Sequence, residues 1–218
     1  MIPVDISVTN ADVMKKKTSE APQDDLRPHY DFDYAKMKPN RFAGEAKVYK
    51  RTPMDQPQVT ELLNYFERVR ERTMRVVACI PPERVDWTYR EGKFTLGDLM
   101  RHLASIERWM FAENAQRKAS RYPGHGIELA DGYDTIVAFM RRMHEESMAI
   151  FGALTDGDLE QKCVTPGGAA LRIGKWLRLM IEHEIHHRGQ IYLYLAMLGI
   201  ETPPLYGLTE EEVKRRSG

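Results

Sequence analysis

The sequence predicts an all-α protein: a four-helix up-and-down type bundle with an N-terminal extension of little regular structure. Apolar residues recur at three- and four-residue steps in four separate segments, which is the period of amphipathic helices. No segment of any length alternates apolar and polar residues, as a half-buried strand would. Four helices of about 20 residues with moderate connections favour a bundle. We expect the extension at residues 1–55, the bundle at 56–207 and a C-terminal tail at 208–218.

The first two helices have recognisable ends. Residues 1–55 are rich in Pro, Lys and Asp and are not expected to share the main core. The helical period starts near Pro57 and stops at the paired prolines of IPPERVDW. In the second helix, Thr95 and Asp98 have the spacing of a capping box. His102 lies close to the apolar side of this helix. That side is formed by Leu96, Leu99, Leu103, Ile106 and Met110.

The third and fourth helices follow the same pattern. Residues 132–154 carry a third apolar stripe, formed by Ile136, Phe139, Met140, Met143, Met148 and Phe151. Residues 155–170 break the period and suggest a short extended excursion. The fourth helix is expected from about Ile173 to Met197, because Gly199 suits a left-handed C-terminal cap.

Composition restricts the partners and the compartment. Thirty-two Lys and Arg residues balance thirty-two Asp and Glu residues, so no basic field favours nucleic acid. No stretch reaches the ~18 consecutive apolar residues of a membrane span, and the first residues lack the basic-then-apolar order of a secretory signal. Cys79 and Cys163 lie in unrelated contexts, as reduced thiols do. We expect a cytoplasmic protein with a small-molecule substrate and no nucleic-acid or membrane partner.

The stretch IEHEIHHRGQ, residues 181–190, places three histidines within five positions. On a helix, His183 and His187 lie on one face with Cβ atoms about 5–6 Å apart, so both can point to one metal ion. The pattern predicts that both histidines face the bundle interior, because the other residues of their stripe are mostly apolar: Trp176, Met180, Ile191 and Tyr194. Buried imidazoles need hydrogen-bond or metal partners. With His102 as a third inward histidine, the pattern favours a metal site over satisfied core histidines.

Two further interpretations concern the same stretch. His186 lies about 100° around the helix from either neighbour, so we expect it in solvent or beside a ligand instead of on the metal. The pattern His183-Glu184-x-x-His187 also fits a zinc peptidase, in which the glutamate activates metal-bound water. The longer form of that motif wants glycine and histidine where this chain has Gln190 and Leu193, which makes the peptidase the weaker alternative. No function is assigned to His29, His125 and His144.

Two sequence elements about eighty residues apart carry a family resemblance. LMRHLASIERWMF contains His102 and Glu107, and HEIHHRGQIYLYLAMLGI begins at His183. In this order, over roughly residues 57–207, they resemble the DinB/YfiT-like superfamily of bacterial metal-binding four-helix bundles. This family is unrelated to the DNA polymerase that shares the DinB name.

The resemblance implies a divalent metal ion, usually zinc or nickel, bound by His102, His183 and His187. Characterised relatives include S-transferases and isomerases that use low-molecular-weight thiols, and many members are classed only as metal-dependent hydrolases. A metal-dependent transferase or hydrolase with a thiol cosubstrate is therefore the implied activity. Three imidazoles leave one position of a tetrahedral ion open for water or for a thiol.

Residues beside the histidines are candidates for supporting roles. Glu107 and Glu184 are candidates to accept hydrogen bonds from ligand imidazoles, with helix-surface salt bridges to Arg188 or Arg108 as the alternative. Arg188 and Gln190 belong to the family motif, and we expect them either to contact an anionic substrate or to hold the helix in place. The candidates for the pocket wall, which a place in the core would also explain, are Trp109, Tyr192 and Tyr194.

A non-catalytic, metal-stabilised binding module is the alternative from another functional class. Such a module is expected to close the metal site with a fourth protein ligand, for which residues 210–212 and His29 are available. A catalytic metal keeps that position open. We also expect a homodimer, because related bundles often pair through their helices.

Overall fold

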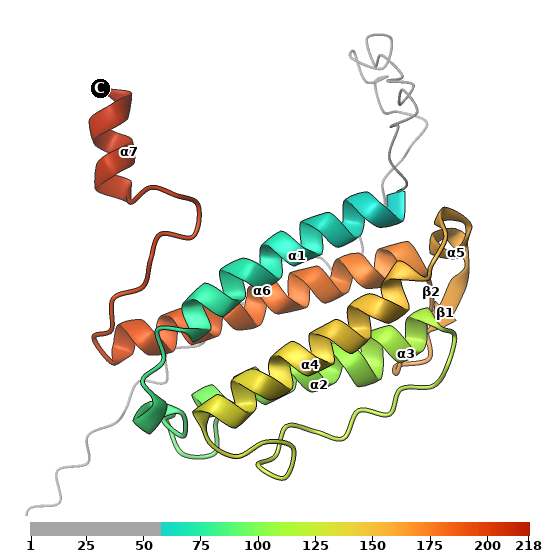
Figure 1. Ribbon diagram of the computed structural model, residues 1–218, viewed down its shortest axis with the longest axis horizontal. Helices are drawn as coiled ribbons and strands as arrows, with labels where there is room; N and C mark the ends of the chain where they lie inside the picture. Colours follow the sequence, from blue (N-terminus) through green and yellow to red (C-terminus); the bar gives the residue numbers. More distant parts are fainter. Residues whose placement is uncertain (1–57) are drawn as a thin grey trace, which may run out of the picture. The chain divides into compact units, whose positions relative to one another are not determined.

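The computed structural model describes residues 58–218, so the expected extension at 1–55 and its boundary lie outside the described residues. Within this range the protein is a bundle of four long helices: α1 (Gln58–Val77), α2 (Leu96–Ile106), α4 (Tyr133–Gly152) and α6 (Ile173–Met197) (Figure 1). The prediction of an all-α four-helix bundle is confirmed. None of the described helices combines the length and the apolar character needed to cross a bilayer.

Local sequence sets the helix ends. Thr95 Oγ1 accepts a hydrogen bond from the Asp98 amide at 3.0 Å, and Asp98 Oδ2 accepts one from the Thr95 amide at 2.9 Å, so the predicted capping box starts α2. Gly199 follows α6 with a φ of 71°, the left-handed conformation that glycine adopts without strain. After α1, the paired prolines lead into a 3₁₀ turn, η2 (Pro82–Arg84).

A π-helical turn, η3 (Glu107–Phe111), interrupts the second long helix before it continues as α3 (Ala112–Ala115). The Ala112 amide bonds to the Glu107 carbonyl five residues back, which adds one residue to the turn. The buried face shifts as a result, so that Glu107 and Phe111 are buried. Two residues that the α-helical period placed on the apolar side are only partly buried, Ile106 and Met110.

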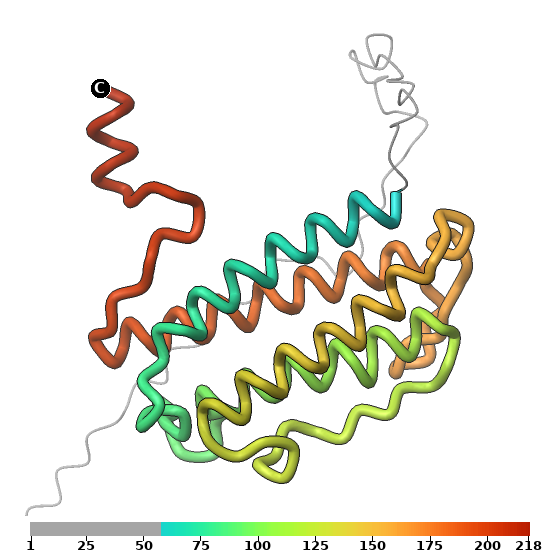
Figure 2. Tube along the Cα trace, in the orientation of Figure 1, coloured from blue at the N-terminus to red at the C-terminus, as the bar shows by residue number. Residues whose placement is uncertain are grey.

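The connection between the second and third long helices, residues 116–132, runs back along α2 (Figure 2). Its hydrogen bonds meet α2 and η3 in reverse order: Arg121 N to Trp109 O, Ser105 Oγ to Gly124 O, and Arg101 Nη1 to Ala130 O. Because the chain returns to its starting level, α2 and α4 run in the same direction. The bundle order is up-down-down-up, which differs from strict alternation at this one connection.

Short elements complete the described chain. Helix α5 (Asp156–Glu160) precedes an antiparallel hairpin of β1 (Lys162–Val164) and β2 (Ala170–Arg172), in which Cys163 pairs with Leu171. This hairpin is the extended excursion that the broken period suggested. The expected C-terminal tail contains a helix, α7 (Glu210–Ser217), which Thr209 caps.

The core consists of two apolar clusters with a polar layer between them. Each long helix contributes residues to both clusters, for example Phe66 and Val76 from α1 or Leu177 and Ile191 from α6. Between these positions every helix buries polar or charged side chains: Arg70 and Thr73, Ser105 and Glu107, Ser147, Glu184 and Arg188. A layer of buried polar and charged side chains therefore crosses the bundle between the two apolar clusters.

Candidate metal centre

Three imidazoles from two helices converge where α2 packs against α6. The Nε2 atom of His183 lies 3.2 Å from Nε2 of His102 and 3.0 Å from Nε2 of His187. One nitrogen of each ring lies within 4.8 Å of the other two. Zn–N bonds of the usual length hold two ligand nitrogens ~3.3 Å apart at a tetrahedral angle. The three-histidine cluster (His102, His183 and His187) therefore has the donor type and the spacing that suit a divalent metal ion.

The environment keeps these imidazoles neutral. Burial lowers the pKa of His102 to about 4, and the neighbouring His187 and His125 lower it as well. Burial also lowers the pKa of His183 to about 3, with His187 and His102 acting in the same direction. Burial lowers the pKa of His187, although its hydrogen bond with Gln190 opposes this shift. A neutral ring offers the lone pair that a metal requires, so the cluster is ready to bind a cation near pH 7.

Two polar side chains orient the ligand rings. Nδ1 of His187 lies 2.7 Å from Oε1 of Gln190, and Nδ1 of His102 lies 2.7 Å from Oη of Tyr122. When each Nδ1–H donates to its oxygen, the lone pair is left on Nε2, which faces the centre of the cluster. Tyr122 belongs to the connection 116–132, so the fold of that connection brings it to His102.

Removing these orienting contacts is expected to weaken metal binding. Gln190→Ala and Tyr122→Phe should each reduce zinc affinity about 10- to 100-fold, the usual effect of losing a hydrogen bond behind a ligand. Gln190→Glu retains an acceptor and should lose less. Competition with a chromophoric chelator measures the affinity, and Gln161→Ala, at an exposed residue outside the cluster, is the matched control. Equal affinities for Gln190→Ala and the control would contradict the orienting role.

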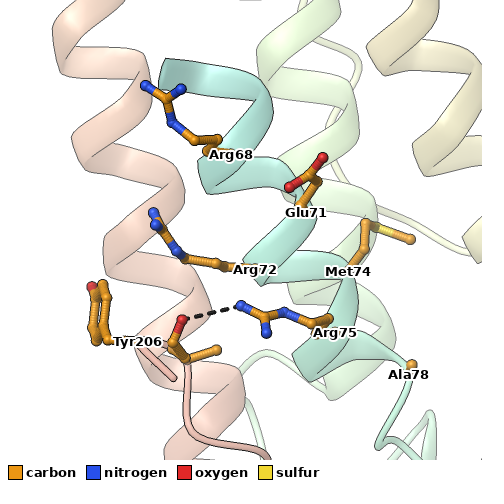
Figure 3. A pocket seen from close by; sticks show the side chains of 8 residues that line it. Arg68, Glu71, Arg72, Met74, Arg75, Ala78 and Tyr206 are labelled. Carbon is orange, nitrogen blue, oxygen red and sulfur yellow. Dashed lines mark hydrogen bonds between the residues drawn. The ribbon is translucent and has the colours of Figure 1, made fainter. Parts of the chain in front are cut away.

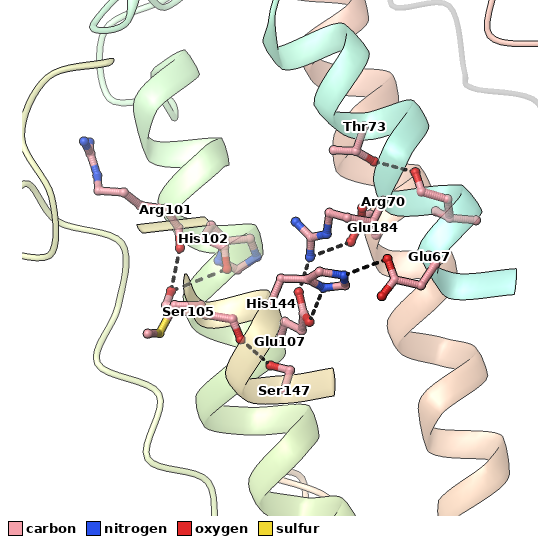
Figure 4. A network of polar contacts seen from close by, with 12 residues as sticks. Glu67, Arg70, Thr73, Arg101, His102, Ser105, Glu107, His144, Ser147 and Glu184 are labelled. Carbon is pink, nitrogen blue, oxygen red and sulfur yellow. Dashed lines mark hydrogen bonds and ion pairs between the residues drawn. The ribbon is translucent and has the colours of Figure 1, made fainter. Parts of the chain in front are cut away.

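The two predicted acidic residues lie in a different cluster, which we call the Arg70 cluster (Glu67, Arg70, Glu107, His144 and Glu184). Arg70 of α1 forms ion pairs with Glu107 of η3 and with Glu184 of α6, the latter at 2.9 Å (Figure 4). His144 of α4 places Nδ1 2.9 Å from Glu107 and Nε2 3.4 Å from Glu67. All four long helices therefore meet in one network of charges.

Mutual interactions set the charges of the Arg70 cluster. Burial alone would raise the pKa of Glu107, but Arg70 and His144 hold it below its usual value. Burial alone would lower the pKa of His144, but the hydrogen bond and charge of Glu107 raise it. Burial raises the pKa of Glu184 against the attraction of Arg70. The Arg70–Glu107–His144 contacts thus favour the charged form of each partner.

The contribution of His144 to stability is expected to fall as pH rises. A group whose pKa is raised in the folded state stabilises fully below its unfolded pKa, about 6.5 for histidine, and loses that effect as pH rises through the folded pKa. In urea unfolding of the metal-free protein, wild type should exceed His144→Gln by an amount of the order of 1 kcal/mol at about pH 6 and by less at about pH 9. The test compares wild type with the variant because both proteins contain His102 and His183. The lowered pKa values of these two residues change stability with pH in the direction opposite to His144, and the comparison cancels that effect. A difference that does not vary with pH would contradict this assignment.

The contacts of the supporting residues match the structural roles that the sequence left open, although the arginine partner of the two glutamates is neither Arg188 nor Arg108. Glu107 and Glu184 bind Arg70 and do not accept hydrogen bonds from the three-histidine cluster, because both point into the polar layer. Arg188 is buried and donates to the Val69 carbonyl of α1 at 3.3 Å, so it holds two helices together. Trp109 packs on Phe139 with ring centroids 5.9 Å apart and belongs to the core.

The remaining predicted residues are the two tyrosines, His186 and the candidates for a fourth metal ligand. Tyr194 lines a cleft together with His187 and Gln190, whereas Tyr192 lines a different hollow. His186 is exposed, with its Nε2 3.3 Å from the Gln190 amide nitrogen. Residues 210–212 lie on α7 and contribute no ligand to the cluster. His29 lies outside the described residues.

Sequence reasoning missed several residues that the fold brings to these sites: Arg70, Tyr122, His125 and His144. The pattern held little signal for Arg70, since a lone arginine within a charged helix is usually solvated. Tyr122 and His125 lie close together in a loop containing YPGHG, and their proximity to each other was the only local hint. His125 packs on Phe94 with ring centroids 4.2 Å apart, close to His102.

A hollow of about 790 Å³ lies along α1, and no histidine lines it (Figure 3). Three arginines at helical spacing line it, Arg68, Arg72 and Arg75. Arg72 lies over the ring of Tyr206, and Arg75 donates to the Leu205 carbonyl at 3.1 Å. It contains none of the candidate site residues, so we place the functional site at the three-histidine cluster.

The fold and the cluster define a class of protein: four-helix bundles in which three histidines from two helices converge at a spacing that a divalent ion would fit. The chain belongs to the DinB superfamily, whose family model matches residues 65–191. That span includes all three histidines of the cluster.

Solved structures show the same fold. A DinB-like protein from Bacillus cereus ATCC 10987 is 21% identical, with a TM-score of 0.57 over 69% of this chain and 99% of that one. A DinB-like protein from Bacillus subtilis is 20% identical, with a TM-score of 0.56 over 66% of this chain and 96% of that one. A mycothiol-dependent maleylpyruvate isomerase is 16% identical over 63% and 61%, and its TM-score of 0.44 is too low to transfer any property. No curated protein matches the sequence.

Proposed function

We propose that the protein is a metal-dependent enzyme whose single divalent ion, zinc or nickel, is held by His102, His183 and His187. The observation that carries this proposal is the convergence of three neutral imidazoles at 3.0 and 3.2 Å. Imidazole suits both ions. Three neutral rings bring no charge of their own, so the ion would keep its positive charge for a substrate.

The number of ligands favours chemistry over a purely structural metal. Among residues 58–218, only these three side chains form a group able to share one ion. A tetrahedral ion held by three protein ligands has a fourth position for water or substrate, which is the arrangement of catalytic sites. When bound there, the ion supplies Lewis acidity, which turns a coordinated water or thiol into a nucleophile near pH 7.

The chain's own residues prepare this position. Gln190 and Tyr122 fix the rings of His187 and His102, so that the nitrogens need little rearrangement on binding. Phe111, whose ring centroid lies 6.0 Å from that of His183, provides an apolar neighbour to the cluster. An apolar boundary limits competing water and strengthens electrostatic interactions within the site.

Metal content and coordination test the proposal directly. On protein purified without a histidine tag and never exposed to chelator, elemental analysis should find one zinc or nickel per chain. X-ray absorption at the metal edge should then find three imidazole nitrogens and one exchangeable light ligand. A fourth protein ligand would support the non-catalytic binding module instead, and folded protein with no metal would leave three satisfied core histidines.

A thiol cosubstrate distinguishes the two proposed reaction types. In a transferase, the ion held by the three histidines would lower the pKa of a low-molecular-weight thiol, and the sulfur would bond to an electrophilic carbon as the bond from that carbon to its leaving group breaks. Adding such a thiol to cobalt-substituted protein should produce a sulfur-to-metal charge-transfer band. If thiols give no band and react with electrophiles no faster in the presence of the protein, the hydrolase remains, with water as the nucleophile.

The zinc peptidase alternative lacks its general base. In such peptidases the glutamate after the first histidine faces the metal-bound water. Here Glu184 is buried, and its Oε2 lies 2.9 Å from Arg70 of α1, a helix that carries none of the three histidines. We therefore do not favour peptide hydrolysis.

We also propose that the protein acts as a homodimer in the cytoplasm. Pairing through helices is common among bundles and would leave the three-histidine cluster of each subunit intact. Light scattering at micromolar concentration should give particles of twice the mass of the chain. Particles of the mass of one chain alone would refute the dimer.

A further inference from the structure

An apolar cleft of about 670 Å³ adjoins the three-histidine cluster, with His187 and Gln190 in its wall. We call it the aromatic cleft, because it is lined by Tyr89, Phe94 and Tyr194 together with leucine and methionine side chains. Its volume lies within the range of pockets that hold small molecules. Because a metal ligand forms part of its wall, a compound bound here would lie beside the proposed metal.

Two of the aromatic rings pack on each other, and the third packs on the three-histidine cluster. Tyr89 and Tyr194 pack edge to face with centroids 5.5 Å apart, and Phe94 packs against His102 at 5.6 Å. Tyr89 is 48% exposed, and two aliphatic neighbours are more exposed, Leu193 at 58% and Met197 at 54%. Apolar surface of this extent beside a site favours an apolar ligand body.

One fully charged side chain lines the cleft. Of the described residues in its wall, Lys93 alone carries a full charge at neutral pH. It is exposed, and no carboxylate of residues 58–218 lies within salt-bridge distance of its ammonium group. The cleft therefore combines an apolar wall with a single positive charge.

We propose that the aromatic cleft binds a small carboxylate with an aromatic or branched apolar body. The body would lie on Tyr89, Phe94 and Tyr194, and the carboxylate would face Lys93. A lysine ammonium suits this role, because it is a mobile point charge that can follow an anion at the rim. This inference names the substrate class of the proposed metal enzyme and so rests on the proposed function.

Phenylacetate and phenylacetamide test the inference, because they have nearly the same shape and differ in charge. Ligand-detected NMR titrations would use metal-free full-length protein first, so that a carboxylate cannot gain affinity by binding the metal. Phenylacetate should bind more tightly than phenylacetamide. Lys93→Met should weaken phenylacetate binding about fivefold, as expected for an exposed charge pair, and leave phenylacetamide unchanged. Lys93→Arg should restore most of the affinity.

Two further variants distinguish the cleft from general effects. Tyr89→Ala should weaken both probes, since it removes part of the shared wall. Lys175→Met, at an exposed lysine in the first turn of α6, removes the same charge outside the cleft and should change neither probe. Equal binding of the two probes, equal losses for Lys93→Met and Lys175→Met, or no binding of phenylacetate would overturn the inference.

Metal analysis of the protein as purified, before the metal is removed for the titrations, separates this inference from the proposed function. A Lys93-dependent preference for the carboxylate in protein that never takes up metal would support the cleft and reject the metal enzyme. One metal ion per chain without that preference would retain the enzyme and reject the cleft as a carboxylate site.

Discussion

Replacement of any one of His102, His183 and His187 by alanine is expected to lower zinc affinity more than about 100-fold. Losing a hydrogen bond behind a ligand already lowers affinity about 10- to 100-fold, and losing the ligand itself should exceed that. Two imidazoles cannot surround an ion that three are placed to share at 3.0 and 3.2 Å. Chelator competition measures the affinity, and circular dichroism checks that each variant is folded.

His186→Ala is the matched control for these three variants. It removes an imidazole from the same helix, next to His187, but from an exposed position. Zinc affinity should stay within a few-fold of wild type. The same loss in all four variants would show that the face assignment on α6 is wrong.

Arg70→Met is expected to destabilise the metal-free protein by about 3–5 kcal/mol, the effect of removing one partner from a buried ion pair. Arg70 is 4% exposed, and Glu107 and Glu184 would be left in the interior without their counter-charge. Glu184 already has a raised pKa, so it should take up a proton in the variant. Urea unfolding followed by circular dichroism measures the change in free energy.

Two comparisons test whether charge causes this loss. Arg70→Met combined with Glu107→Gln and Glu184→Gln removes the uncompensated charges and should recover a large part of the stability. Arg72→Met, two residues along the same helix, removes an arginine that lies over the Tyr206 ring and belongs to no ion pair among residues 58–218, and it should change stability by about 0.5 kcal/mol or less. Failure of the triple variant to recover would indicate that Arg70 acts through packing.

Short-range signals in the sequence were sufficient for the helices and their ends. Thr95 and Asp98 identified the start of α2, and Gly199 with the apolar period identified α6 from Ile173 to Met197. Such signals depend on residues within one or two turns, so they can be read from one chain. The i, i+4 spacing of His183 and His187 belongs to the same kind of signal.

Features that depend on distant partners could not be read in this way. The π-helical turn has no sequence signature, and it changed which residues after Ile106 are buried. The partner of Glu107 and Glu184 could not be identified from the sequence, because Arg70 lies on another helix and is far away in sequence. Tyr122 reaches His102 only because residues 116–132 fold back along α2.

The extra residue of η3 also restricts how this protein can change in length during evolution. A π-helical turn corresponds to one residue inserted into an α-helix, and each residue advances an α-helix by about 100°. Deleting that residue would leave His102 facing α6 but rotate Phe111 away from Trp176, with which it now packs at 4.5 Å. Length variation among descendants of this chain should therefore accumulate in the connection 116–132, where backbone can be added without turning one half of the helix against the other.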